Sequence, residues 1–217
     1  MINAKLFCRS FIIIIIYDKI KIYIRIGEEM KEQVKNIIKK YLERNPNEEN
    51  RLLPLLGYLE RFNEEEIIDW NNTSGHITVG AFVYCKTEDK FLVLHHKDLD
   101  MYLYPGGHVD KKDNSLLDAA KRELKEETGI KEFKLLETND KILPIDIDIH
   151  LIPKNERVNM SEHFHFDFRY LFLIDSIDNI KIDKEEFYSY RWISIDELSR
   201  DKNFGSIINK LKEVLIW

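Results

Sequence analysis

The feature that most constrains this chain is a short unit in which two adjacent glycines, at 106–107, precede a predicted helix crowded with glutamates. Gly129 has the position and the residue type typical of the end of that helix. Three glutamates lie three and four positions apart and therefore share one face of it: Glu123, Glu126 and Glu127. Like charges at this spacing repel, so the unit is costly unless a cation binds among the carboxylates.

A divalent cation would remove this repulsion. Hard cations such as Mg2+ bind carboxylate oxygens, main-chain carbonyls, water and substrate phosphates. A glycine turn lets the backbone approach closely, so the carbonyl of Gly106 is suited to complete the ligand set. The alternative is a solvated acidic face interspersed with Lys121, Arg122 and Lys125. We favour the cation because the helix follows a strand and a diglycine turn within one short unit.

The segments G-G-H-V-D-K-K-D and R-E-L-K-E-E-T-G-I resemble the Nudix box, whose pattern is G-x5-E-x7-R-E-U-x-E-E-x-G-U with U an aliphatic residue. The second half matches at every fixed position, from Arg122 to Ile130. The first half departs from the pattern. Counting forward from Gly107, the glutamate position holds Asp113; counting back from Arg122, it holds Asn114, because one extra residue lies between. The insertion falls in the loop that enters the helix, where length is tolerated.

The resemblance covers about residues 75–217, including a preceding hairpin and a late Trp192 followed by D-E-L. It implies a Nudix-like α/β/α sandwich. Independently, the irregular alternation of strand and helix patterns indicates an α/β fold with a mixed sheet, of the α+β kind. The resemblance also implies hydrolysis of a nucleoside diphosphate linked to another group, with Mg2+ or Mn2+ as the cofactor.

The resemblance assigns roles to single residues. The metal ligands that it implies are Gly106, Glu123, Glu126 and Glu127. Arg122 would orient the glutamates by ion pairing, and Glu123 is the first choice for the base that activates water. The chemistry agrees, because metal ions neutralise an anionic pyrophosphate and acidify bound water, while a carboxylate within reach takes the proton.

Two other functions stay open. The first is an enzyme similar to isopentenyl diphosphate isomerase, which shares the fold. Its chemistry resembles a proton transfer by a Cys and a Glu, and Cys85 would be the thiol here. A non-catalytic, nucleotide-binding Nudix regulator is the other alternative. The intact R-E-L-K-E-E argues against it, as does the lack of a basic module that reads DNA.

Polar and apolar residues alternate along two later segments. The sequence P-I-D-I-D-I-H places its aspartates and His150 on one strand face, and H-F-H-F-D-F-R places its phenylalanines opposite the polar residues. We interpret the polar face as a pocket lining, with Asp167 as a further metal ligand. The candidate substrate-binding residues are His76, Tyr102, Tyr104, His108, His163, His165 and Arg169, the tyrosines by stacking on a base. A zinc or iron site at His163, His165 and Asp167 is the less favoured interpretation.

The chain divides into three regions. Residues 1–29 carry an isoleucine run too short to span a bilayer and without a small-residue cleavage site. They fit either an edge strand at 19–26 or a translated leader ahead of a natural start at Met30. Residues 30–72 form a predicted helical extension, which would serve as packing, as a lid or as the surface of a homodimer. Residues 75–217 form the Nudix-like domain.

Composition limits the partners and the compartment. A net charge of -6 and a pI of about 5.7 argue against a nucleic-acid scaffold, which normally has a basic face. The two cysteines, Cys8 and Cys85, are far apart, which argues against a disulfide framework and favours a reducing cytoplasm. We expect no membrane partner, and a small nucleoside diphosphate derivative as the substrate.

Overall fold

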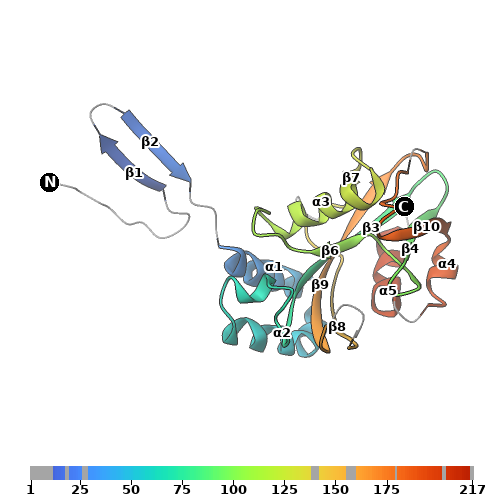
Figure 1. Cartoon of the computed structure of the whole chain (residues 1–217), viewed down its shortest axis with the longest axis horizontal. Coiled ribbons are helices and arrows are strands. Elements are labelled where there is room, and N and C mark those ends of the chain that lie inside the picture. The colour runs from blue at the N-terminus through green and yellow to red at the C-terminus, as the bar shows by residue number, and fades with distance from the viewer. Residues whose placement is uncertain are drawn as a thin grey trace.

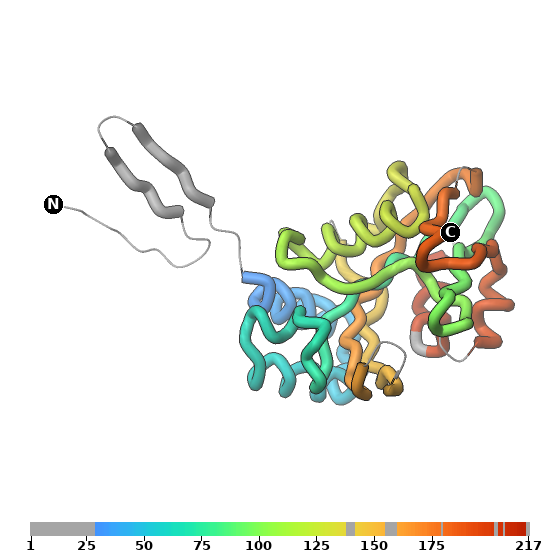
Figure 2. Tube along the Cα trace, viewed as in Figure 1, coloured from blue at the N-terminus to red at the C-terminus, as the bar shows by residue number. Residues whose placement is uncertain are grey.

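The computed structural model describes residues 12–17, 20–25, 29–137, 142–154, 160–178, 180–201 and 204–215. Its centre is an eight-stranded mixed sheet of order β10-β4-β3-β9-β7, in which β5 pairs with β4, β6 with β3 and β8 with β9. The strands are β3 (Gly75–Cys85), β4 (Lys90–His96), β5 (Met101–Leu103), β6 (Gly106–His108), β7 (Lys134–Leu135), β8 (Asp146–Ile152), β9 (His163–Ile174) and β10 (Phe187–Ile193). Figure 2 follows the chain through them.

The middle of this sheet is the parallel pair β3–β9, aligned over residues 75–85 and 164–174. Parallel strands are normally covered on both faces, and β3 is buried along its whole length. The register places His165 opposite His76 and Asp167 opposite Thr78. On the other side of β9, β8 pairs Asp148 with Asp167. The polar face predicted from the alternation is confirmed, and it runs across three adjacent strands.

Helix α3 (Leu116–Thr128) covers one face of the sheet with a fully buried apolar stripe: Leu116, Ala119, Ala120 and Leu124. The Oγ of Ser115 accepts the main-chain N–H of Asp118 at 3.1 Å, which caps the start of the helix. Gly129 ends it in the left-handed conformation, with φ 72°. The helix predicted from the glycine and glutamate pattern is therefore present, with its charged residues at the margin of the buried stripe.

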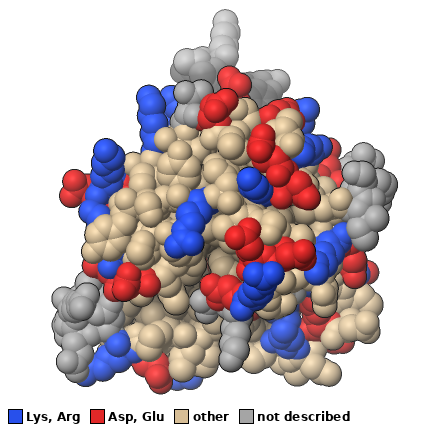
Figure 3. Space-filling view, turned by 90° about the vertical axis from the view of Figure 1, so that its right-hand side faces the viewer, with Lys and Arg blue, Asp and Glu red and all other residues tan. Residues whose placement is uncertain are grey.

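The opposite face is covered by α4 (Ile195–Leu198) and α5 (Gly205–Val214), which pack on a second apolar cluster around Phe82 and Phe91. Figure 1 shows these two helices at the lower right, α1 and α2 at the lower left, and α3 above β6. The predicted α/β/α sandwich is confirmed. In Figure 3, acidic and basic side chains are interspersed over the face shown and do not gather into a basic patch.

The helical extension consists of α1 (Met30–Arg44), η1 (Pro46–Glu48), α2 (Glu49–Arg61) and η2 (Glu66–Ile68). It packs on the sheet as part of the same apolar cluster as α3. The ring of Tyr58 lies 4.5 Å from that of Phe166, and its hydroxyl donates to the Gly75 carbonyl at 2.7 Å. Packing is therefore one role of this segment, while a dimer surface stays a prediction.

Strands β1 (Ile12–Tyr17) and β2 (Ile20–Arg25) pair with each other in a separate two-stranded sheet. β2 falls within the predicted strand at 19–26, but its partner is β1 and not an edge of the main sheet. Residues 1–11, 18–19 and 26–28 lie outside the described residues, so the predicted leader before Met30 falls partly outside them. No helix among the described residues has the length and apolar character needed to cross a membrane.

A buried ion network joins the extension to the sheet and to the last helix. Asp146, which is fully buried on β8, accepts hydrogen bonds from Arg169 and Arg51 at 3.2 Å each and from Lys210. Burial by itself would raise the pKa of Asp146, but the charges of Arg169 and Lys210 outweigh it, and the pKa is lowered. Asp146 thus links cations from α2, β9 and α5, which Glu48, Asp148 and Asp167 also help to neutralise.

Replacing Asp146 with Asn is expected to lower the free energy of unfolding by about 3–5 kcal/mol, because buried cations lose their counter-charge. Urea denaturation measures it. The matched control is Glu60→Gln, which removes an ion pair with Lys35 in which the glutamate side chain is 75% exposed. That change should leave the free energy of unfolding nearly unchanged, because solvent screens an exposed ion pair. Equal effects for the two substitutions would contradict a structural role for Asp146.

Candidate active site

The first anchor of the site is a hydrogen bond between the glutamate-rich helix and the diglycine turn. Glu127 is buried, and its Oε2 accepts the main-chain N–H of Gly106 at 2.9 Å. Burial raises the pKa of Glu127 well above its usual range; the Gly106 N–H opposes this, and the charge of Glu123 adds to it. A carboxylate held in this way is costly alone and gains most from a nearby cation.

Glu123 lies one turn earlier, against the backbone of the second glycine. A Cβ built on Gly107 would come within 2.9 Å of the Glu123 carboxylate carbon, so only glycine leaves room for that side chain. Burial raises the pKa of Glu123, while the charge of Arg122 lowers it. A raised pKa suits a carboxylate that accepts a proton. The side chain of Glu126, by contrast, is 58% exposed and lies at the rim.

Arg122 holds the acidic residues in place. Its Nη1 donates to Glu123 at 2.8 Å and to Glu126 at 3.0 Å. Its Nε and Nη2 donate to the two carboxylate oxygens of Asp113 at 3.1 and 2.9 Å, and Nη2 also donates to the His108 carbonyl at 2.8 Å. This bidentate pairing with Asp113 fixes the plane of the Arg122 guanidinium. The geometry fits the predicted orienting role of Arg122.

Asp113 also settles which residue stands at the shifted glutamate position of the box. Besides holding Arg122, it accepts the main-chain N–H of Asp110 at 2.8 Å, which braces the loop before α3. The carbonyl of Asn114, by contrast, accepts a hydrogen bond from Gln33 of the extension. The forward count from Gly107 therefore identifies the bracing residue, although its side chain is one methylene shorter than glutamate.

Two acidic residues at the site were missed by the sequence analysis: Asp183 and Glu186. The segment after β9 returns to the end of α3, where the main-chain N–H of Asp183 donates to the Glu127 carbonyl at 3.0 Å. The charges of both residues raise the pKa of Glu127. The only available signal was an acidic D-K-E-E segment directly before the final strand, and no spacing rule connects it to the box.

A cavity of about 590 Å3 opens beside Glu123 and Arg122. One wall belongs to the diglycine loop and α3, and the other to the end of the extension. The lining residues from the extension are Asn63, Glu65, Glu66, Ile68, Asp69 and Trp70. Trp70 is 54% exposed, so it presents an aromatic ring to whatever enters. The helical extension therefore contributes to the wall of the site as well as to packing.

The predicted polar residues separate into two groups. His76, His108 and His165 come together, with one nitrogen from each ring within 4.8 Å of the others, and His163 Nε2 lies 3.1 Å from His165 Nε2. Burial lowers the pKa of His76 to about 3 and that of His165 to about 2, so both are neutral at pH 7. His108 also lines the cavity, which places this group next to the carboxylates.

The other predicted residues make structural contacts. Asp167 accepts hydrogen bonds from Thr78 at 3.2 Å, from Tyr104 at 2.5 Å and from Arg169 at 3.0 Å. The ring of Tyr104 stacks on Phe82 at 4.3 Å. These contacts engage Asp167, Tyr104 and Arg169 within the protein, so their roles as metal ligand and substrate contacts stay predictions. Tyr102 lies beneath the Arg191 guanidinium at 3.8 Å, and neither tyrosine lines the cavity.

Comparison with known protein families identifies the domain to which this site belongs. The NUDIX domain matches residues 75–213. This chain belongs to the Nudix hydrolase family. Nudix hydrolases generally use divalent metals, and the carboxylates fit one: two are buried or half-buried and a third lies at the rim, and all offer hard oxygen ligands.

Several known Nudix proteins are similar to this one. A probable DHNTP pyrophosphohydrolase from Lactococcus lactis subsp. cremoris (strain MG1363) is 31% identical over 145 residues, which cover 67% of this chain and 78% of that protein. Among solved structures, a NUDIX-family hydrolase from Clostridium perfringens is 27% identical with a TM-score of 0.48, covering 64% of this chain and 95% of the other. An Ap4A hydrolase from C. elegans is 18% identical with a TM-score of 0.49, covering 64% and 96%.

Cys85 is the cysteine that the structure describes, and it does not lie at the Nudix site. Cys85 is fully buried, and its Sγ lies 3.3 Å from the Thr87 hydroxyl. It lies five residues beyond Gly80, the β3 residue that pairs with Gly106, which corresponds to about 17 Å along the strand. A proton transfer that uses this cysteine together with Glu123 is therefore not supported.

Gly107→Ala is expected to inactivate this Nudix site without unfolding the chain. The new Cβ would displace the flexible carboxylate end of Glu123 rather than backbone. A misplaced catalytic group of this kind costs about a hundredfold in rate. Turnover, Mn2+ binding by electron paramagnetic resonance, and the melting temperature together measure the effect.

The control is Gly57→Ala in α2, where an added Cβ meets nothing within 4 Å. It should keep full activity and raise stability by about 0.5–1 kcal/mol, the usual difference between Gly and Ala inside a helix. Wild-type turnover in the Gly107→Ala protein would show that Glu123 does not need its present position.

Proposed function

We propose that this Nudix hydrolase is a Mg2+-dependent pyrophosphohydrolase that cleaves a diphosphate linkage in a nucleoside diphosphate derivative or a related nucleotide-like molecule. The observation that carries the proposal is the carboxylate cluster itself. Glu123 and Glu126 are held by Arg122, Glu127 is held by the Gly106 N–H, and a cavity opens beside them. A non-catalytic regulator would have no need of this buttressed acidic set.

The residues divide the work of hydrolysis among themselves. When bound at the carboxylates, Mg2+ would neutralise phosphate charge and acidify a bound water. Glu123, with its raised pKa, takes the proton as the water oxygen attacks phosphorus and the bond to the bridging oxygen breaks. Arg122 keeps Glu123 in reach by its hydrogen bond of 2.8 Å. Glu127 and the Gly106 carbonyl would complete the metal ligands.

The substrate class follows from the cavity and from a relative. Trp70 offers an aromatic surface at the cavity wall, which suits a flat heteroaromatic ring. The Lactococcus lactis relative is named for DHNTP, a triphosphate that carries such a ring. We therefore include DHNTP beside ADP-ribose, dinucleoside polyphosphates, nucleotide sugars, NADH, CoA and nucleoside triphosphates in a screen for released phosphate or pyrophosphate.

On the best substrate of that screen, Glu127→Gln is expected to lower turnover by at least about a hundredfold, because a metal ligand loses its charge. Folding should be spared, since the glutamine oxygen can still accept the Gly106 N–H. The raised pKa means that the ionised carboxylate costs stability at neutral pH. The metal-free variant should therefore melt at the same temperature as the wild type or higher.

Glu65→Gln is a matched control for this substitution. Glu65 also lines the cavity, but its side chain is 80% exposed and lies outside the cluster. It should retain nearly full turnover. Wild-type turnover in the Glu127→Gln protein would remove Glu127 from the metal site, and a screen in which nothing is hydrolysed would overturn the proposed activity.

Trp70→Ala is expected to raise KM and leave kcat largely unchanged, because the ring binds substrate away from the reacting phosphorus. Stacking of a base on an aromatic side chain is worth about 1–3 kcal/mol, so KM should rise at least about fivefold. Leu53→Ala is the control, since Leu53 is equally exposed, at 54%, and does not line the cavity. An unchanged KM in the Trp70→Ala protein would contradict stacking by Trp70.

A further inference from the structure

The proposed hydrolysis leaves one buried polar side chain unexplained. His76 is fully buried on β3, and neither of its ring nitrogens has a hydrogen-bond partner within the described part of the chain. Native proteins rarely leave a buried polar atom in this state, and where they do, an ion or a water is the usual partner. A ligand other than the described residues, such as a metal ion, would therefore satisfy the two nitrogens of His76.

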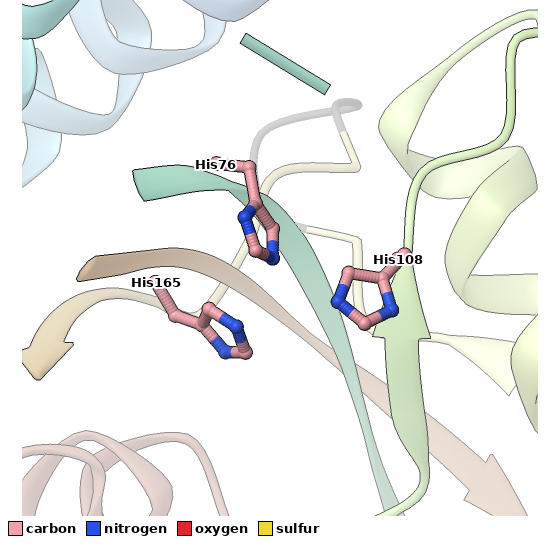
Figure 4. Close-up of side chains that lie close together, drawn as sticks. All are labelled: His76, His108 and His165. Carbon is pink, nitrogen blue, oxygen red and sulfur yellow. The ribbon is translucent and has the colours of Figure 1, made fainter. Parts of the chain in front are cut away.

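Two further imidazoles face the same point. The register pairs His76 with His165 of β9 and pairs Thr78 with His108 of β6, so all three histidines lie on one face of the sheet. Figure 4 shows the three rings pointing toward one another from three strands. One nitrogen from each lies within 4.8 Å of the others. A tetrahedral Zn2+ with three imidazole ligands places them about 3.4 Å apart, which small ring rotations can reach.

The surrounding hydrogen bonds prepare His165 to be a ligand. The carbonyl of Ser161 can only accept, so Nδ1 of His163, 2.8 Å away, carries a proton. In the tautomer with its proton on Nδ1, His163 offers Nε2 as an acceptor, and Nε2 of His165 donates to it at 3.1 Å. The remaining nitrogen of His165 keeps its lone pair. Metal-binding histidines typically donate their other N–H in this way, which fixes the orientation of the ring.

We propose that His76, His108 and His165 bind a transition-metal ion, Zn2+ before others, at a site separate from the carboxylates. Neutral imidazoles suit Zn2+ and related ions, whereas Mg2+ prefers oxygen ligands. Three histidines leave a fourth position for water or for a substrate oxygen, and His108 reaches the cavity. The ion would tie β6 to β3 and β9. It would also steady the His108 carbonyl that accepts from Arg122.

Protein purified without a polyhistidine tag, stripped with a chelator and titrated with Zn2+ by calorimetry tests this site. Wild type should bind one Zn2+ per chain that excess Mg2+ does not displace. His165→Asn and His76→Phe should each weaken that binding at least tenfold. His95→Asn, a histidine outside the cluster that pairs with Asp100, should leave it unchanged, and so should the double substitution Glu123→Gln with Glu127→Gln.

Two results would overturn the proposal. Wild type that takes up no more Zn2+ than His165→Asn excludes the site. Zn2+ binding that disappears in the double glutamate variant and persists in both histidine variants places the ion at the carboxylates. X-ray absorption of Zn2+-loaded wild type decides the matter even if both histidine variants fail to fold: imidazole ligands support the site, and oxygen ligands alone reject it. Because none of these readouts is catalysis, they are independent of the proposed hydrolysis.

Discussion

The parallel pairing of β3 with β9 is the constraint on which the rest of this protein depends. It joins segments almost ninety positions apart and buries the apolar residues of both strands under α3 and the extension. On the other face, the same register aligns His76 with His165, Thr78 with Asp167 and Gly80 with Arg169. A slip of one residue would turn the polar side chains into the apolar layer, so the core and the polar face specify each other.

At the acidic site, by contrast, the carboxylates of α3 repel one another, and a bound cation would relieve that repulsion. Burial and neighbouring carboxylates raise the pKa of both Glu123 and Glu127, so the helix would be more stable without their charges. Arg122 and Asp113 offset part of this cost by fixing the charges that face the cavity. Preorganisation of this kind is typical of sites that stabilise a reacting anion.

The extension links stability to specificity. Arg51 of α2 reaches the buried Asp146, which also pairs with Arg169 of the sheet and Lys210 of α5. The same segment ends in Trp70, at the wall of the cavity. The Nudix domain match covers residues 75–213, whereas the extension lies outside it and adds a second wall to the cavity. The choice of substrate is therefore expected to depend on residues outside the box, since selectivity arises in pocket walls more than in the reacting centre.

The sequence by itself determined whatever depends on neighbours a few residues apart. Helical spacing placed Arg122 and the three glutamates together, and alternation placed His163, His165, Asp167 and Arg169 on one strand face. What only the tertiary structure decided is which distant segments meet. In the folded chain Asp113 pairs with Arg122, and Asp183 and Glu186 lie near Glu127. Tyr104 packs against Phe82, and His76, His108 and His165 cluster together. Strand register and loop return are set by burial across the whole sheet, and no short window of sequence contains that information.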